Sequence, residues 1–152
     1  MEVILDETAG NRLYLRGLAI RYERWRRQAG CWTPIMWHLA LRGHTGGMIE
    51  LADWFSRIGG PKALGTPADA FSAAGLYRRA WRKGDTRAAN NMAVSCFNGN
   101  DMMGYRHWLR CAAKAGDTGA ARELRNFETR LPHRLAQRVG RLRPQQKRDA
   151  TY

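Results

Sequence analysis

The stretch G-D-T-R-A-A-N-N-M-A-V-S-C-F-N-G, residues 84–99, decides the fold of this chain. Its small and apolar residues recur at the spacing of an amphipathic helix. The same opening returns as G-D-T-G-A-A at residues 116–121. A glycine at each opening is suited to the left-handed conformation that ends a preceding helix. The stretch therefore predicts a helix, and its recurrence predicts a repeated unit.

The repeat extends toward the N-terminus. Each of four glycines stands eight residues before an apolar residue, in the pairs Gly10 and Leu18, Gly43 and Leu51, Gly84 and Met92, and Gly116 and Leu124. An alanine directly follows the first three of these apolar residues. A period of about 32 residues is typical of stacked helical hairpins. The sequence thus predicts an all-α fold, an α-solenoid of about four stacked antiparallel helix hairpins.

The repeats divide the chain into one domain with two short flanks. We expect an N-terminal extension at 1–9, a repeat domain at 10–141 and a basic flexible tail at 142–152. The units are expected at 10–42, 43–83, 84–115 and 116–141.

Turn and cap residues predict the helix ends within these units. The first helix is expected to end at Gly30, and Thr33 with Pro34 to start the second. Further helices are expected at Thr45–Arg57, Asp69–Lys83 and Pro132–Arg141, with residues 59–67 forming a loop.

The third unit resembles the Sel-one-like repeat, a relative of the tetratricopeptide repeat. That family reads approximately A-x-x-x-L-G-x-x-Y-x-x-G, a short loop, and then W-Y-x-K-A-A-x-x-G-x-x-x-A. The matching residues here are Ala88, Met92, Ala93, Cys96, Gly99, Trp108, Leu109, Ala112, Ala113, Gly116 and Ala120. The resemblance covers roughly residues 10–131 and departs at Cys96, where the family has an aromatic residue. It implies an adaptor or scaffold protein that organises complexes.

The charge of the chain favours acidic partners. Lys and Arg number 26 against 13 Asp and Glu, which gives a net charge of +13. Such an excess attracts nucleic acid, anionic lipid or acidic protein surfaces. A GC-rich genome, which enriches arginine without a functional demand, is the alternative explanation.

The same sequence predicts a cytoplasmic protein. The N-terminus lacks the basic start and long apolar run of a signal peptide, and no stretch approaches the length of a membrane span. The 3 cysteines show no C-x-x-C spacing, so reduced thiols are expected.

No set of residues predicts catalysis or a cofactor. His38, His44, His107 and His133 are scattered, whereas a zinc site needs three or four converging ligands. The glycine-rich stretch at 59–65 lacks the G-K-[ST] ending of a phosphate-binding loop. We therefore expect a non-enzymatic protein with no metal and no cofactor.

The leading hypothesis is an adaptor that binds an acidic protein or peptide segment. In tetratricopeptide relatives the first helix of each hairpin faces the concave side, so the resemblance implies a set of partner-binding residues. Arg87 and Asn90, one turn apart, could hold a peptide carboxylate or backbone; ordinary solvated polar residues are the alternative. Trp54 and Trp81 are candidates for further exposed contacts. The full expected set is Ile49, Asp53, Arg57, Arg87, Asn90, Val94, Asn98, Arg122, Asn126 and Arg130.

The second hypothesis is a nucleic-acid-associated protein. Arg134, Arg138 and Arg141 follow helical spacing and would form a stripe that contacts phosphates. No base-reading motif accompanies them. A solvated capping helix is the alternative for this segment.

Overall fold

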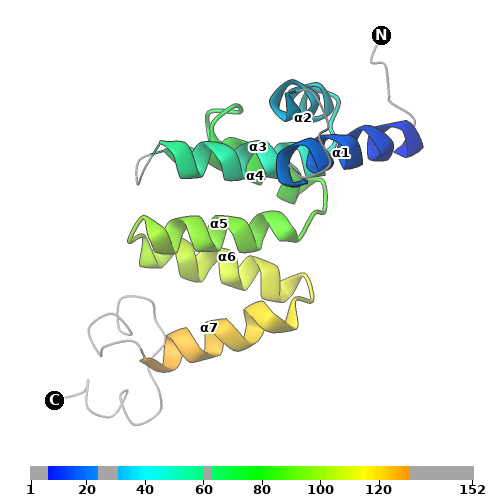
Figure 1. The fold of residues 1–152 in the computed structure, drawn as a ribbon. Helices are drawn as coiled ribbons and strands as arrows, with labels where there is room; N and C mark the ends of the chain where they lie inside the picture. Colours follow the sequence, from blue (N-terminus) through cyan, green and yellow to red (C-terminus); the bar gives the residue numbers. More distant parts are fainter. Residues whose placement is uncertain (1–6, 24–30, 60–62, 131–152) are drawn as a thin grey trace, which may run out of the picture.

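The structure, a computed structural model, describes residues 7–23, 31–59 and 63–130. Within these ranges it has seven helices and no strand, so the predicted all-α class is confirmed (Figure 1). The helices are α1 (Glu7–Tyr22), α2 (Trp32–Leu41), α3 (Thr45–Ile58), α4 (Ala73–Arg82), α5 (Arg87–Asn98), α6 (Met102–Lys114) and α7 (Thr118–Arg130).

Each helix packs against the next one along the chain, and α3 also contacts α5. Figure 1 shows α3 with α4, then α5 with α6, then α7, following one another from one end of the molecule to the other. One core cluster of buried residues runs through these contacts. Its largest fully buried side chains are Tyr77, Met36, Leu39, Met48, Leu51 and Leu76, and the many buried alanines between them let the helices approach closely.

Three glycine turns connect α2 to α3, α4 to α5 and α6 to α7. Gly43, Gly84 and Gly116 have φ values of 84°, 93° and 100°, as predicted. In each turn the following residue donates its N–H back to a carbonyl near the end of the helix, for example Asp117 to Ala112 at 3.1 Å. This hydrogen bond satisfies one of the carbonyls that a helix end leaves open.

Gly10, which has the same spacing to an apolar residue, does not share this role. It lies inside α1, which begins three residues earlier at Glu7. Gly10 is buried, and a Cβ there would stand 3.5 Å from the ring of His44. A Cβ at this position would therefore make an ordinary van der Waals contact with the ring.

Two predicted helix starts are also wrong. α2 begins at Trp32, so Thr33 lies inside the helix instead of capping it. α4 begins at Ala73 instead of Asp69. The reason is Ser72, whose hydroxyl donates to the Thr66 carbonyl at 2.7 Å and accepts the Gly75 N–H at 3.0 Å. These bonds hold the residues before α4 in turns.

α3 begins at Thr45, as predicted, despite two glycines in its first turn. His44 caps it, because its Nδ1 accepts the Gly47 N–H at 3.3 Å. A Cβ on Gly47 would lie 2.9 Å from the Cβ of Leu39 in α2. Glycine at this position therefore lets α2 and α3 approach closely.

Several predictions fall outside the described residues. They concern the end of the first helix at Gly30, the expected helix Pro132–Arg141 and the tail at 142–152. The phosphate contacts expected of Arg134, Arg138 and Arg141 belong to the same undescribed segment. Among the described helices, none has the length and apolar character needed to cross a membrane.

A candidate binding groove between α3 and α5

A cavity of about 500 Å³ opens between α3 and α5, and we call it the α3–α5 groove. Its lining residues are Asp53, Ser56, Arg57, Leu64, Tyr77, Asn91, Val94, Ser95, Asn98 and Gly99. Val94 also lines a second cavity, of about 220 Å³, which includes Asn90, Asp117 and Glu123. The two cavities therefore meet at one apolar side chain, which is 56% exposed.

The α5 wall of the groove carries a row of polar side chains. Asn91, Ser95 and Asn98 are spaced by four and three residues, so they lie on one face of the helix beside Val94. Among the described residues, none forms a hydrogen bond with the side-chain amide of Asn91 or Asn98. Each amide offers one acceptor oxygen and two donor hydrogens. The wall thus presents polar groups that are available to a bound molecule.

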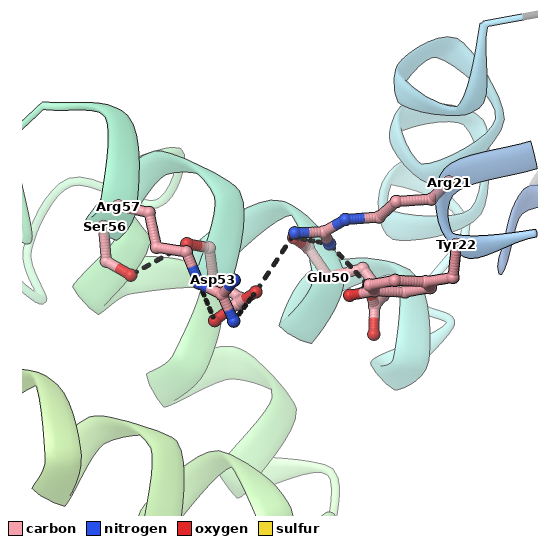
Figure 2. A network of polar contacts seen from close by, with 6 residues as sticks. All are labelled: Arg21, Tyr22, Glu50, Asp53, Ser56 and Arg57. Atoms are coloured by element: carbon pink, nitrogen blue, oxygen red, sulfur yellow. Dashed lines mark hydrogen bonds and ion pairs between the residues drawn. The ribbon is translucent and has the colours of Figure 1, made fainter. Parts of the chain in front are cut away.

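The α3 wall is charged and internally paired. Asp53 accepts from Arg57 one turn later in α3, with an Nη2–Oδ2 distance of 3.1 Å, and from Arg21 of α1, also at 3.1 Å (Figure 2). The Arg57 side chain is 69% exposed, whereas that of Arg21 is 8% exposed. Arg57 can therefore turn toward a bound molecule at little cost, and Arg21 cannot.

Arg21 fastens α1 to α3 beside this wall. Its guanidinium carbon lies 4.3 Å from the ring centre of Trp32 and 4.9 Å from that of Tyr22. It pairs with Glu50 at 2.5 Å, and the Tyr22 hydroxyl donates to the same carboxylate at 2.9 Å (Figure 2). Burial and then this hydrogen bond raise the pKa of Tyr22 to about 12. Because these contacts hold Arg21 in place, the Asp53 carboxylate that Arg21 binds is held in place as well.

Tyr77 of α4 lies at the bottom of the groove and is 1% exposed. Burial, and then the charge of Asp53, raise its pKa to about 12. The buried ring thus forms the bottom of the groove between the two walls.

The structure brings together five of the ten predicted partner-binding residues. Asp53, Arg57, Val94 and Asn98 line the α3–α5 groove, and Asn90 lines the second cavity. Arg122, Asn126 and Arg130 are exposed on α7 and line neither cavity.

Ile49 is a correction to the predicted set. It is only 6% exposed and belongs to the core cluster, so it cannot contact a partner directly. Ile49 shares a helix face with Asp53, one turn later, but at this turn of α3 the side chain is covered by the core cluster.

The predicted Arg87–Asn90 pair is engaged within the protein. Arg87 makes two bonds to the Asp85 carboxylate, at 3.0 and 2.7 Å. The side-chain hydrogen bond between the two groups is the largest cause that lowers the pKa of Asp85 and raises the pKa of Arg87. Asn90 donates to Asp117 at 2.5 Å and so connects α5 to the turn before α7. Both side chains are therefore bonded to carboxylates of the protein itself, although the Arg87 side chain is 60% exposed.

Sequence reasoning missed six residues that line the groove: Asn91, Ser95, Leu64, Tyr77, Ser56 and Gly99. The signal for the first two was the row of polar residues at Asn91, Ser95 and Asn98 on one helix face. Leu64 gave no signal, because residues 59–67 have the composition of a loop. In the structure, the Leu64 carbonyl accepts the Ala74 N–H at 2.8 Å. This bond holds Leu64 against the start of α4, where it lines the groove.

The two tryptophans expected to make exposed contacts are both partly buried. Trp54 packs edge-on against Trp32, with ring centres 5.4 Å apart. Trp81 packs edge-on against Trp108 at 6.4 Å and lies against the core. Both rings remain partly exposed.

In the described ranges, no group of three or more His, Cys, Asp or Glu side chains could hold a metal ion. Comparison with known proteins adds no family: no protein-family model, no curated protein and no solved structure matches the chain.

Proposed function

We propose that this protein is a non-enzymatic adaptor, an α-solenoid of Sel-one-like repeats, whose α3–α5 groove binds an extended segment of another protein. The observation that carries the proposal is Val94. It is an exposed apolar side chain at the point where two cavities meet, and unengaged amides flank it on the same helix face.

The chemistry of the groove suits a peptide backbone. A peptide in extended conformation presents alternating N–H and C=O groups at about 3.3 Å per residue. Asn91 and Asn98 lie two helical turns apart, about 10 Å along α5. Their amides can each donate to a carbonyl and accept from an N–H of the same segment, while an apolar side chain of the partner covers Val94.

Charge favours an acidic partner. Arg57 is the exposed basic residue of the groove and could exchange Asp53 for a carboxylate of the bound segment. The net charge of +13 would speed encounter with such a partner. The resemblance to Sel-one-like repeats supports the same class of function.

The test is a matched pair of charge insertions on exposed apolar residues. Val94 is 56% exposed on α5 and Met103 is 53% exposed on α6. A photo-crosslinking residue at position 94 first identifies the partner in the native host, and its segment is then synthesised. We expect Val94→Glu to weaken binding of that segment at least tenfold and Met103→Glu to leave it unchanged. Equal binding by the two variants would contradict the proposal that the α3–α5 groove binds the segment.

A further inference from the structure

Helices α4 and α6 carry basic residues and no carboxylate. Their charged residues are Arg78, Arg79, Arg82, Arg106, Arg110 and Lys114. Among them, only Arg106 forms an ion pair with a described residue, namely Glu128 of α7 at 2.9 Å. The positive charge of the other five is therefore not neutralised by direct pairing within the described part of the chain.

The carboxylates at the ends of these helices are already engaged. Asp85, after α4, is bonded to Arg87 and to the Thr45 hydroxyl at 2.8 Å. Asp101 caps α6 by accepting the Gly104 N–H at 2.9 Å. Asp117, after α6, accepts the Ala120 N–H at 2.8 Å. None of the three lies in an ion pair with a basic residue of α4 or α6.

Two half-buried tryptophans join α4 to α6. The rings of Trp81 and Trp108 meet edge-on, with centres 6.4 Å apart. Arg78 and Arg82 are one turn apart on α4 and flank Trp81 in sequence, and Arg110 and Lys114 are one turn apart on α6. We call these residues the α4–α6 surface; its members are Arg78, Trp81, Arg82, Trp108, Arg110 and Lys114.

We propose that the α4–α6 surface binds the phosphate backbone of a single-stranded nucleic acid. Repeated unpaired cations without intervening carboxylates complement a polymer that carries one charge per nucleotide. Guanidinium groups bind phosphate oxygens through paired hydrogen bonds. Partly exposed tryptophan rings among cations are the surfaces on which unpaired bases stack.

Two other polyanions fit this surface less well. A membrane would require several protruding apolar side chains among the cations, whereas α4 has no exposed large hydrophobic residue and α6 has one, Met103. A duplex is read by a helix that enters a groove, whereas α4 is packed along α3 and α5. The surface is separate from the α3–α5 groove, since the two sets share no residue, so this proposal does not depend on the proposed function.

The test compares two fourfold variants of the full chain with the same net charge. In the first, Arg78, Arg82, Arg110 and Lys114 are changed to Gln. In the second, the exposed arginines Arg12, Arg16, Arg122 and Arg125 of α1 and α7 are changed to Gln. Both variants keep every basic residue after residue 130, so any contribution from that segment is the same in each. Circular dichroism of both variants checks that they remain folded.

Binding is measured by fluorescence anisotropy with a labelled 15-nucleotide poly-uridine at several salt concentrations. We expect the first variant to bind at least tenfold more weakly than the wild type and the second to bind within threefold of it. The slope of log affinity against log salt should fall by about 0.7 for each phosphate that the protein no longer neutralises, which is about 3 in the first variant.

Three results would overturn the proposal. They are no binding by the wild type at 50 mM salt, equal losses in the two variants, and tighter binding to a duplex or to anionic phosphatidylserine vesicles than to the single strand. Changing both Trp81 and Trp108 to Phe provides a second readout, because the quenching of protein fluorescence on binding should then decrease.

Discussion

Arg21 and Glu50 stand 29 positions apart in the chain, and their side chains meet at 2.5 Å. Arg21 also donates to the backbone carbonyl of Glu50, at 3.1 Å. The guanidinium is 8% exposed and the carboxylate 15%. The pair is thus a largely buried connection between α1 and α3, and it sits between the rings of Trp32 and Tyr22.

Arg21→Met is expected to destabilise the protein strongly. It leaves Glu50 without its cation in a largely buried place, and loss of one partner of such a pair costs about 3–5 kcal/mol. Partial exposure of the carboxylate places the expected loss near the lower end, at about 3 kcal/mol. Urea denaturation followed by circular dichroism measures the change.

Arg57→Met is the matched control, because Arg57 pairs with Asp53 of the same network but is 69% exposed. Exposed pairs contribute about 0–1 kcal/mol. Similar losses in the two variants would mean that burial of Arg21 does not govern the strength of the network.

Ala112→Leu is expected to overpack the contact between α6 and its neighbours. Ala112 is 0% exposed, and inserting a larger side chain into a packed core costs about 1–3 kcal/mol. Ala115→Leu, at the exposed end of the same helix, should change stability by less than about 0.5 kcal/mol. Thermal melts of both variants decide the point, and a wild-type melt for Ala112→Leu would contradict the packing.

The predicted parts of the fold are those that depend on local backbone chemistry. Gly43, Gly84 and Gly116 were predicted as turns because each follows a helical pattern and can take a positive φ. Gly10 has the same spacing to its apolar residue but has no turn to form. Spacing alone does not separate a glycine that ends a helix from one that lies inside a helix.

The candidate site was only half predictable, because it depends on tertiary contacts. Val94 and Asn98 follow from the position of the first helix in the unit. The bonds of Arg87 to Asp85 and of Asn90 to Asp117 could not be predicted. Both carboxylates lie in turns, and the geometry of a turn decides which side chains meet. The burial of Ile49 is likewise decided by packing against its neighbours.

Gly116→Val is expected to destabilise the turn between α6 and α7 through the backbone alone. Among the described residues, chain neighbours aside, none has an atom within 4 Å of a Cβ built at Gly116, whose φ is 100°, so the Cβ itself is not crowded. A left-handed conformation costs a residue with a Cβ about 1–2 kcal/mol, and a β-branched residue suffers most.

Gly99→Ala is the comparison, because Gly99 has a φ of −81° that alanine adopts readily. It should be neutral or stabilising by up to about 1 kcal/mol. Limited proteolysis should also show new cleavage after about residue 115 in Gly116→Val, since among the described helices α7 packs mainly against α6. A protease pattern like that of the wild type would exclude local loosening.

The stability of the protein should fall as the pH decreases below about 7, because of His44. Burial, and then the charge of Arg87, lower the pKa of His44 from its ordinary 6.5. Its Nδ1 accepts the Gly47 N–H that caps α3, and its Nε2 lies 3.1 Å from the Asn11 oxygen. This arrangement needs the neutral ring, with the proton on Nε2.

The direction of this pH dependence follows from the number of protons that each state binds. Because the folded pKa is below the unfolded value, the unfolded state binds more protons between the two values. The stabilisation is complete above about pH 6.5 and is lost as the pH falls toward the folded pKa. His44→Asn keeps a capping acceptor without titrating, so its stability should change less between pH 7 and 5. The cap itself contributes about 1 kcal/mol. Urea denaturation of the wild type, His44→Asn and the control His38→Asn across this range measures the effect. The same decrease in all three proteins would show that another group is responsible.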